Sequence, residues 1–133
     1  MLTIDKNLKK LKCFFKEGTY EGKEYDTKGE LFGTFTMTIK YEFDKGYLLL
    51  KVKDYEEKYF LNGTGLNTDN GIEKWCINKN ILCRVIQDTT NLNLVKSIQR
   101  KKTCNLTKNN VYYFDKTKNK YILQGYSIIK FIK

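Results

Sequence analysis

The pattern of hydrophobic and polar residues changes once along the chain, from a helical period to strict alternation. Ile4, Leu8, Leu11 and Phe15 recur at spacings of four, three and four residues, which places them on one face of an α-helix. We therefore predict a short amphipathic helix over residues 4–15. A helix of this length is marginal alone, so its apolar face must either plug one end of the fold or lie on an anionic membrane, and the plug is the favoured interpretation.

The second half of the pattern begins after Gly33. Every odd residue from Phe35 to Phe43 is apolar or aromatic and every even residue is polar, which predicts a half-buried strand. A two-residue loop at Lys45-Gly46, with Gly46 at positive φ, would connect it to the next alternating run and turn both apolar faces to the same side. This loop predicts three opposed pairs, namely Phe43 with Leu48, Tyr41 with Leu50, and Ile39 with Val52.

Short runs bounded by turn residues continue to the end of the chain. With a first strand near residues 19–24, the predicted strands cover 35–43, 48–52, 58–67, 72–78, 81–88, 94–104, 111–115 and 120–132. Asn70-Gly71 is the strongest hairpin signal among the turns. No helix-length segment separates the runs, which excludes a parallel sheet built from βαβ units.

An open sheet of this width would expose two edges, and closure removes them. We therefore predict an all-β fold: an antiparallel up-and-down barrel of about 8–10 strands with a short N-terminal amphipathic helix, forming a single domain over residues 1–133. A two-sheet sandwich is the alternative architecture.

A barrel of this size can hold a small ligand among its inward side chains. The expected pocket residues are the inward-facing apolar and aromatic ones, with tyrosine hydroxyls orienting the polar end of the ligand. The same side chains could instead fill the core. The candidate lining consists of Phe35, Met37, Ile39, Tyr41, Leu50 and Trp75, with hydroxyls from Tyr20, Tyr113 and Tyr126.

Composition removes several classes of site. The chain has no histidine, which excludes a Ser-His-Asp triad, a Cys-His dyad and a histidine-ligated zinc or haem built from this chain alone. No pair of carboxylates stands at a spacing typical of acid–base catalysis, so no catalytic residue is assigned and an enzyme is the least favoured class. We expect neither a cofactor nor a metal.

The four cysteines, Cys13, Cys76, Cys83 and Cys104, contain no Cys-x-x-Cys pair. A tight turn at Lys79-Asn80 would place Cys76 directly opposite Cys83, within disulfide reach. The N-terminus lacks the apolar core of a secretory signal, and no run of 18 apolar residues exists. We therefore expect a cytoplasmic protein without a transmembrane segment, whose cysteines are free thiols buried as small apolar side chains.

The formal net charge of +10 comes mainly from lysine, since Arg84 and Arg100 are the only arginines. A lysine-rich, asparagine-rich sequence without alanine or proline is the product expected of an A+T-rich genome, which weakens the charge as a sign of nucleic-acid binding. Binding of single-stranded nucleic acid nevertheless stays the second candidate, through bases stacked on basic, aromatic strand faces. The interleaved segments are 40–41, 58–60, 112–113 and 120–121.

The segment from Leu8 to Gly22 runs from the predicted helix into Gly18-Thr19-Tyr20. It resembles the start of calycin-type β-barrels, the lipocalins and fatty-acid-binding proteins, in which a short helix precedes a Gly-x-Trp strand; tyrosine takes the place of tryptophan here. The resemblance implies a barrel with an internal ligand. It does not extend to the late arginine of either family, since the final strand offers lysines such as Lys130 and Lys133 and no arginine follows Arg100.

The function expected from the sequence is thus non-enzymatic binding of a small hydrophobic or amphipathic molecule inside the barrel, as a carrier or a sensor. The identity of the ligand, the oligomeric state and the biological process are not encoded in any pattern of the sequence.

Overall fold

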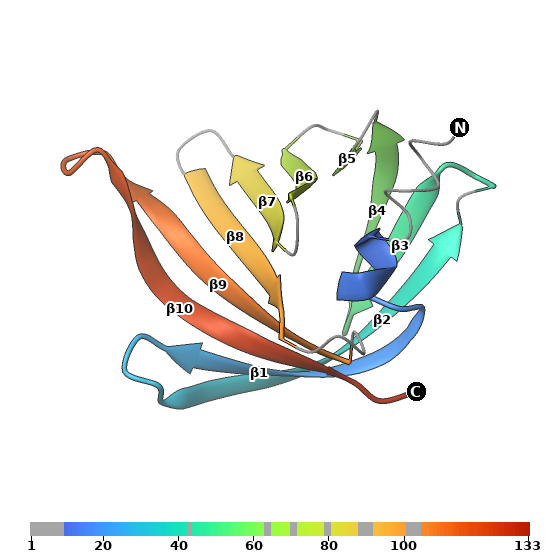
Figure 1. Ribbon diagram of the computed structural model, residues 1–133, viewed down its shortest axis with the longest axis horizontal. Coiled ribbons are helices and arrows are strands. Elements are labelled where there is room, and N and C mark those ends of the chain that lie inside the picture. Colours follow the sequence, from blue (N-terminus) through green and yellow to red (C-terminus); the bar gives the residue numbers. More distant parts are fainter. Residues whose placement is uncertain are drawn as a thin grey trace.

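The structure is a computed structural model that describes residues 10–42, 44–62, 65–69, 72–78, 81–87, 92–100 and 105–133. Within these ranges ten strands form one antiparallel sheet that closes into a barrel, which confirms the predicted fold class (Figure 1). The strands are β1 (Gly18–Asp26), β2 (Leu31–Glu42), β3 (Tyr47–Val52), β4 (Tyr55–Asn62), β5 (Gly65–Asn67), β6 (Glu73–Asn78), β7 (Ile81–Gln87), β8 (Leu92–Gln99), β9 (Leu106–Asp115) and β10 (Lys120–Phe131).

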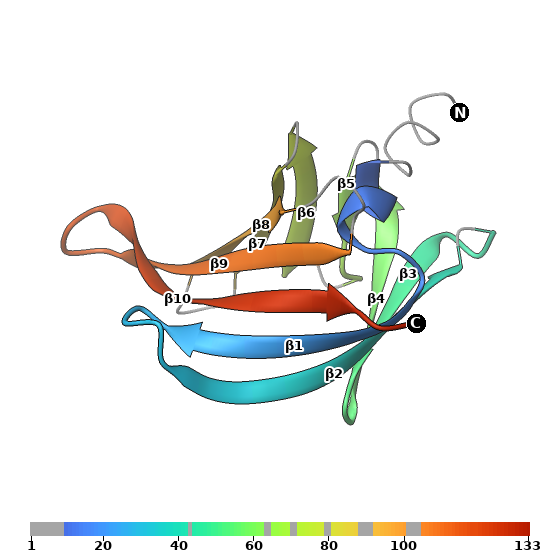
Figure 2. The ribbon, with the colours of Figure 1, turned by 60° about the horizontal axis from the view of Figure 1, so that its bottom comes forward.

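The barrel closes because β1 pairs with both its sequence neighbour β2 and the last strand β10. Tyr20 shows this double pairing: it stands opposite Met37 on one side and Phe131 on the other. Figure 2 shows β2, β1, β10 and β9 side by side along one wall. Every other strand pairs with its neighbours in sequence, so the sheet has no free edge along its closed part.

The sequence predicts nine strands, and the tenth arises from a division of the predicted strand 58–67 into β4 and β5. The start of β4 also lies earlier than predicted, at Tyr55. A two-residue turn, Lys53-Asp54, connects it to β3, and Lys53 takes the left-handed conformation with a φ of 52°. Lysine is an unusual residue for this conformation, so no turn was expected from the sequence at this point.

The predicted register of the β2–β3 hairpin is wrong by two residues. Tyr41 pairs with Leu48 rather than Leu50, since β2 ends at Glu42, which pairs with Tyr47. The connection is therefore residues 43–46, closed by a hydrogen bond of 2.9 Å from the Lys45 N–H to the Glu42 carbonyl. A shift of two residues keeps each side chain on its face, so the predicted inward side is unchanged. The other observed pairs are Ile39 with Leu50 and Met37 with Val52, and Phe43 lies outside the described residues.

The β6–β7 hairpin has the predicted register, with Cys76 opposite Cys83. Both are free thiols, as is Cys13. The expected burial of the cysteines is wrong for Cys13 and Cys76, which are exposed, because both occupy outward positions of their elements. Cys104 and the Asn70-Gly71 turn lie outside the described residues.

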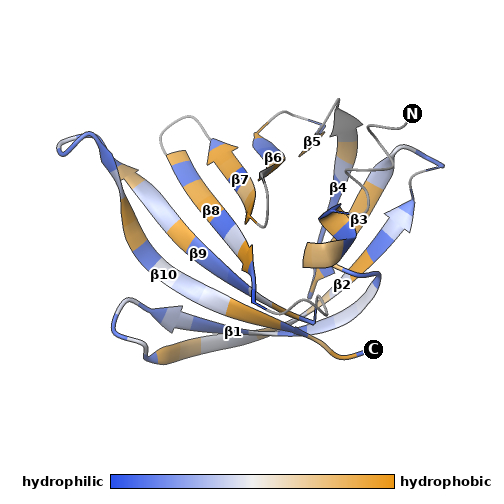
Figure 3. Ribbon diagram, viewed as in Figure 1, coloured by the Kyte–Doolittle hydropathy of each residue, from blue (hydrophilic) through white to orange (hydrophobic). Residues whose placement is uncertain are grey.

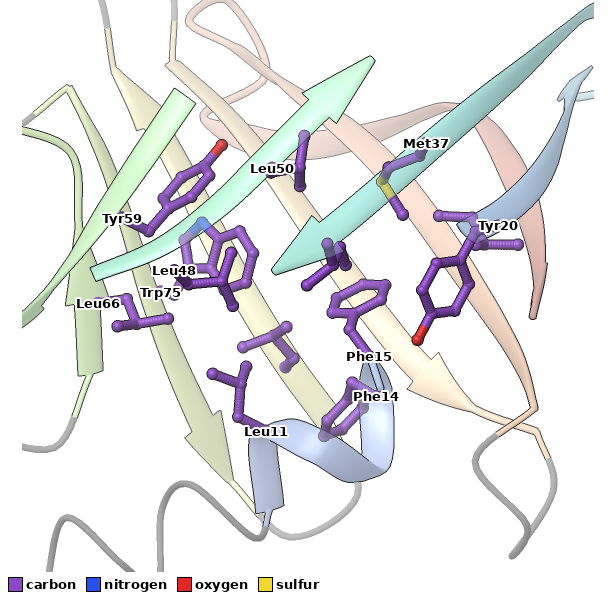
Figure 4. Packing of buried hydrophobic residues seen from close by; sticks show 13 residues of the cluster. Leu11, Phe14, Phe15, Tyr20, Met37, Leu48, Leu50, Tyr59, Leu66 and Trp75 are labelled. Carbon is purple, nitrogen blue, oxygen red and sulfur yellow. The ribbon is translucent and has the colours of Figure 1, made fainter. Parts of the chain in front are cut away.

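The N-terminal helix is described over residues 10–14, while residues 4–9 of its predicted span lie outside the described part. Leu11, Phe14 and Phe15 are buried, and they pack between the strands as the plug interpretation predicts (Figure 4). The Phe15 ring lies 6.1 Å from that of Tyr20 and 6.2 Å from that of Trp75, between centroids. In Figure 3 the helix presents its hydrophobic residues beside the hydrophobic bands of β2 and β3.

Three consecutive carbonyls at the end of this helix accept hydrogen bonds from inward side chains of three strands. Thr107 Oγ1 of β9 donates to the Phe14 carbonyl at 3.1 Å, the Tyr41 hydroxyl of β2 donates to that of Phe15, and the Tyr20 hydroxyl of β1 donates to that of Lys16 at 2.5 Å. The last carbonyls of a helix have no partner within the helix itself. The barrel wall therefore caps the helix and fixes its position.

If the helix is an integral plug, removal of its central ring must destabilise the whole barrel. We expect Phe15→Ala to lower the free energy of unfolding by about 3–5 kcal/mol, because it deletes a fully enclosed aromatic side chain. The exposed Lys12, changed to Ala, is the control and should leave it within about 0.5 kcal/mol. Urea unfolding measures both. A loss below about 1 kcal/mol for Phe15→Ala would mean that the barrel is stable without its plug.

Candidate functional site: the polar wall inside the barrel

The hydrophobic side chains inside the barrel are distributed unevenly. The buried ones form one core cluster on the helix, on β1 to β7 and on β10, and Figure 4 shows how they converge around Phe15. Among the described residues, β8 and β9 contribute none to it; even Val95 of β8, itself buried, is not a member. The core cluster consists of Leu11, Phe14, Phe15, Tyr20, Met37, Ile39, Leu48, Leu50, Tyr59, Leu66, Trp75, Leu82 and Ile129.

A continuous row of polar side chains crosses the inner face of β1, β10, β9 and β8. The register places Glu24 of β1 beside Ser127 of β10, Ser127 beside Asn109 of β9, and Asn109 beside Ser97 of β8. All four share the face of the buried Ile129, which lies two residues from Ser127, so all four are inward positions. We call these four residues the polar row.

Two atoms of the polar row are buried without a hydrogen-bond partner. Asn109 uses its amide nitrogen to donate to Ser127 Oγ at 3.1 Å, but its Oδ1 accepts no bond, and Ser97 Oγ has no partner either. Asn109 is only 2% exposed and Ser97 is fully enclosed. An unpaired buried polar atom costs about 1–3 kcal/mol, so native structures rarely keep one without a use. The polar row therefore offers hydrogen-bonding capacity toward the interior.

A second polar group stands on β4, β6 and β7 around the carboxylate of Glu73. It accepts hydrogen bonds from the Tyr59 hydroxyl at 2.9 Å and from Trp75 Nε1 at 3.1 Å, and Arg84 Nη1 lies 3.6 Å from it. The Arg84 guanidinium also lies over the Trp75 ring, 5.4 Å from its centroid. Arg84 Nε has no partner. The charge of Arg84 is thus matched by Glu73, while the Nε–H of Arg84 is a buried donor without a hydrogen-bond partner.

Local sequence explains how Glu73 reaches this position. The backbone N–H of Glu73 donates to Thr68 Oγ1 at 3.1 Å, and the N–H of Thr68 donates to the Glu73 carbonyl at 3.0 Å. These two bonds join the end of β5 to the start of β6 across the connection between them. Glu73 then shares the inward face with Trp75, two residues further on.

Most of the predicted ligand-binding residues face the interior, but as members of the hydrophobic core. Tyr20, Met37, Ile39, Leu50 and Trp75 belong to the core cluster, and Phe35 and Tyr41 pack against it half-buried. The Tyr20 hydroxyl, expected to orient a ligand, donates to the Lys16 carbonyl, and the hydroxyl of Tyr41, expected in the lining, donates to that of Phe15.

The remaining two predicted residues lie away from this cluster. Tyr126 is on the outer face, where its ring stacks on that of Tyr25 at 5.0 Å between centroids. Tyr113 lies on β9 toward the β9–β10 hairpin and is 40% exposed. Figure 1 shows this hairpin extending beyond the rest of the barrel.

A shallow hollow of about 970 Å³ is present on the outer face of β1, β2 and β3. Its floor carries the outward threonines Thr34, Thr36 and Thr38, and Lys51 and Lys53 flank it. The threonines and Lys51 occupy outward positions of their strands, and Tyr20 and Phe35, whose side chains belong to or pack against the core, also border the hollow.

No family model matches the chain, and no curated protein is similar to it. Within the described residues no group of three or more cysteine, aspartate or glutamate side chains could hold a metal ion. Among the same residues, no helix has the length and apolar character needed to cross a membrane. The candidate site rests on the buried, unpaired polar atoms of the interior.

Burial raises the pKa of two inward phenols, Tyr41 and Tyr59, far above the ordinary value of 10.0. Desolvation is the largest cause for both. The neighbouring Tyr20 and Glu17 raise the pKa of Tyr41 further, and Glu73 does the same for Tyr59, partly opposed by Arg84. Both hydroxyls therefore stay protonated as hydrogen-bond donors at all physiological pH values.

These raised pKa values predict a loss of stability in alkali. Unfolded tyrosines release their protons above about pH 10, whereas Tyr41 and Tyr59 in the folded state do not, so their stabilisation is complete below that pH and is lost as the pH rises above it. Replacing both with Phe removes this dependence. We expect the double variant to show a smaller alkaline fall in the free energy of unfolding than the wild type, measured by urea unfolding on both sides of about pH 10. An equal fall would show that neither phenol is buried.

Proposed function

We propose that the protein binds a small, largely apolar molecule inside the barrel, as a carrier or a sensor. The observation that supports this proposal is the pair of buried and unpaired oxygens of the polar row, on β8 and β9, the two described strands that contribute no residue to the hydrophobic cluster. Ligand sites combine an apolar lining with a few polar groups aimed inward, and this wall has that composition.

A completely filled core would explain the apolar side chains but not the polar ones. Val95 and Val111 flank the polar row on the inner face of β8 and β9, so the wall offers both apolar surface and hydrogen bonds. In a filled core a buried Asn109 Oδ1 would normally meet a donor from the facing wall, since the penalty for leaving it unpaired is large. A bound molecule removes that penalty.

The single tryptophan, Trp75, reports directly on the interior because it is 3% exposed and packs against Tyr59 and Phe15. We expect dodecanol to change its fluorescence saturably, and native mass spectrometry of freshly purified protein to show a co-purifying molecule.

Two matched variants test whether the ligand binds inside or outside the barrel. Val111→Phe fills space on the inner face of β9, whereas Val85→Phe makes the same change on the outer face of β7. We expect the inner variant alone to weaken dodecanol binding, by about ten-fold or more. Equal binding by both variants would contradict an interior site.

A second candidate, binding of single-stranded nucleic acid, is favoured by the outer face of β1, β10, β9 and β8. The Tyr25 and Tyr126 rings stack nearly parallel there, Lys108 lies 4.5 Å from the Tyr126 ring centroid, and Lys96 lies 5.6 Å from that of Tyr112. Tyrosines with lysines beside them are the means by which barrels hold single strands, through stacking and phosphate contacts.

This candidate predicts salt-dependent binding of an oligothymidylate, measured by fluorescence anisotropy. We expect Lys108→Glu to weaken binding more than Lys51→Glu, which makes the same charge change in the outer hollow of β1–β3. Equal weakening by the two variants would show a non-specific effect of net charge, and the absence of binding at low salt would exclude the candidate.

A further inference from the structure

The charges that face the interior have the opposite balance to the charges of the whole chain. Several carboxylates of the described strands are inward: Glu24 by its register with Ser127, Glu57 by its register with the buried Leu50, and Glu73. Asp26 and Asp115 share this face at the ends of β1 and β9, and Lys120 lies opposite Asp115. Arg84 stands against them as the inward guanidinium and is paired with Glu73. Lysines such as Lys23, Lys51 and Lys96 alternate with inward residues and lie on the outer face. The lining is therefore acidic although the chain carries a net charge of +10.

The polar row is rich in hydrogen-bond acceptors. Asn109 Oδ1 is an unpaired acceptor, Ser97 Oγ can accept as well as donate, and Glu24 supplies a carboxylate at the end of the row. The Glu24 carboxylate stays over the inner face of the neighbouring strand, since a Cβ added to Gly33 would lie 2.9 Å from its Oε2. A side chain at residue 33 would displace it.

This chemistry discriminates between ligand head groups. A carboxylate offers only acceptors and negative charge, so it would leave Asn109 Oδ1 unpaired and would be repelled by Glu24. An alcohol can satisfy one acceptor. A protonated primary amine offers three donors and a positive charge, so it can bond Asn109 and Ser97 while Glu24 balances the charge.

We propose that the ligand is a cationic amphiphile, an apolar body that ends in a protonated primary amine bound at the polar row. This proposal rests on the proposed interior site. Asn109 Oδ1 and Ser97 Oγ accept the N–H groups of the amine. Glu24 stands two strands from Asn109, about 10 Å away by backbone spacing. Its carboxylate extends over Gly33 of β2, on the side of β1 away from Asn109, so it acts on the bound ammonium through its charge and not by contact. The unpaired Arg84 Nε does not oppose this assignment, because the charge of Arg84 is already matched by Glu73.

The test compares dodecylamine, dodecanol and dodecanoic acid at neutral pH, each below the concentration at which it aggregates, with Trp75 fluorescence and native mass spectrometry as readouts. The expected order of affinity is amine, alcohol, acid, with the amine about ten-fold tighter than the alcohol, because its hydrogen bonds are charge-assisted. Binding of the acid as tightly as the amine overturns the inference but leaves the interior site standing. Binding of none of the three overturns the proposed function itself.

Two variants assign the selectivity to the polar row. Glu24→Gln keeps the shape of the inward carboxylate and removes its charge, whereas Glu21→Gln makes the same change on the exposed face of the same strand. We expect only Glu24→Gln to reduce dodecylamine affinity, by about ten-fold, with dodecanol affinity unchanged. Asn109→Ala should weaken both, provided its urea midpoint shows a folded protein. Equal dodecylamine affinity in the Glu24 and Glu21 variants overturns the role of Glu24.

Discussion

Closure of the sheet is the constraint on which the rest of the structure depends. Because β1 pairs with β2 on one side and β10 on the other, alternate residues of every strand are directed into one shared interior. Each inward residue must then be packed, hydrogen-bonded or left facing a space. The hydrophobic residues of β2 to β7 are packed by the helix and by one another. On β8 and β9 the inward polar residues are buried too, but Ser97 Oγ and Asn109 Oδ1 have no hydrogen-bond partner, and this difference defines the candidate site.

The helix completes the closure at one end. Its buried side chains supply part of the core, and its last carbonyls accept bonds from Thr107, Tyr41 and Tyr20 on three different strands. These bonds explain why the tyrosines nearest the helix serve the fold. The polar atoms without a partner lie further from the helix. Asn109, whose Oδ1 is unpaired, is two residues beyond Thr107 on β9.

Strict alternation made the fold and the inward face of β2 predictable from the sequence. From Phe35 to Tyr41 each apolar residue alternates with a polar one, so only one face can be buried, and the error of two residues in the β2–β3 register did not move any side chain to the other face. The Cys76–Cys83 pairing was predictable because a two-residue turn leaves one register. The division of β4 from β5 was missed although it has a signal in the sequence, since β4 ends at an Asn62-Gly63 dipeptide of the kind that favours hairpin turns.

The polar row was missed because its strands do not alternate cleanly. In β8, Leu94 and Ile98 lie on the outer face while Val95 and Ser97 lie inward, so apolar residues occur on both faces and the pattern cannot assign either. Tyr126 was placed inward wrongly for a related reason: the register of β10 shifts between Leu123 and Gly125, and a shift of this kind changes which residues face inward. Neither feature has a signal in composition or spacing.

The central claim is our proposal that the inner wall of β8 and β9 receives a molecule from solution. Nuclear Overhauser effects between added dodecylamine and the methyl groups of the protein test it most directly, because they report contact within a few ångströms. We predict effects at the inward methyls of Val95 and Val111. Effects confined to outward methyls, such as those of Val85 and Ile128, would contradict an interior site and would place the binding surface outside the barrel.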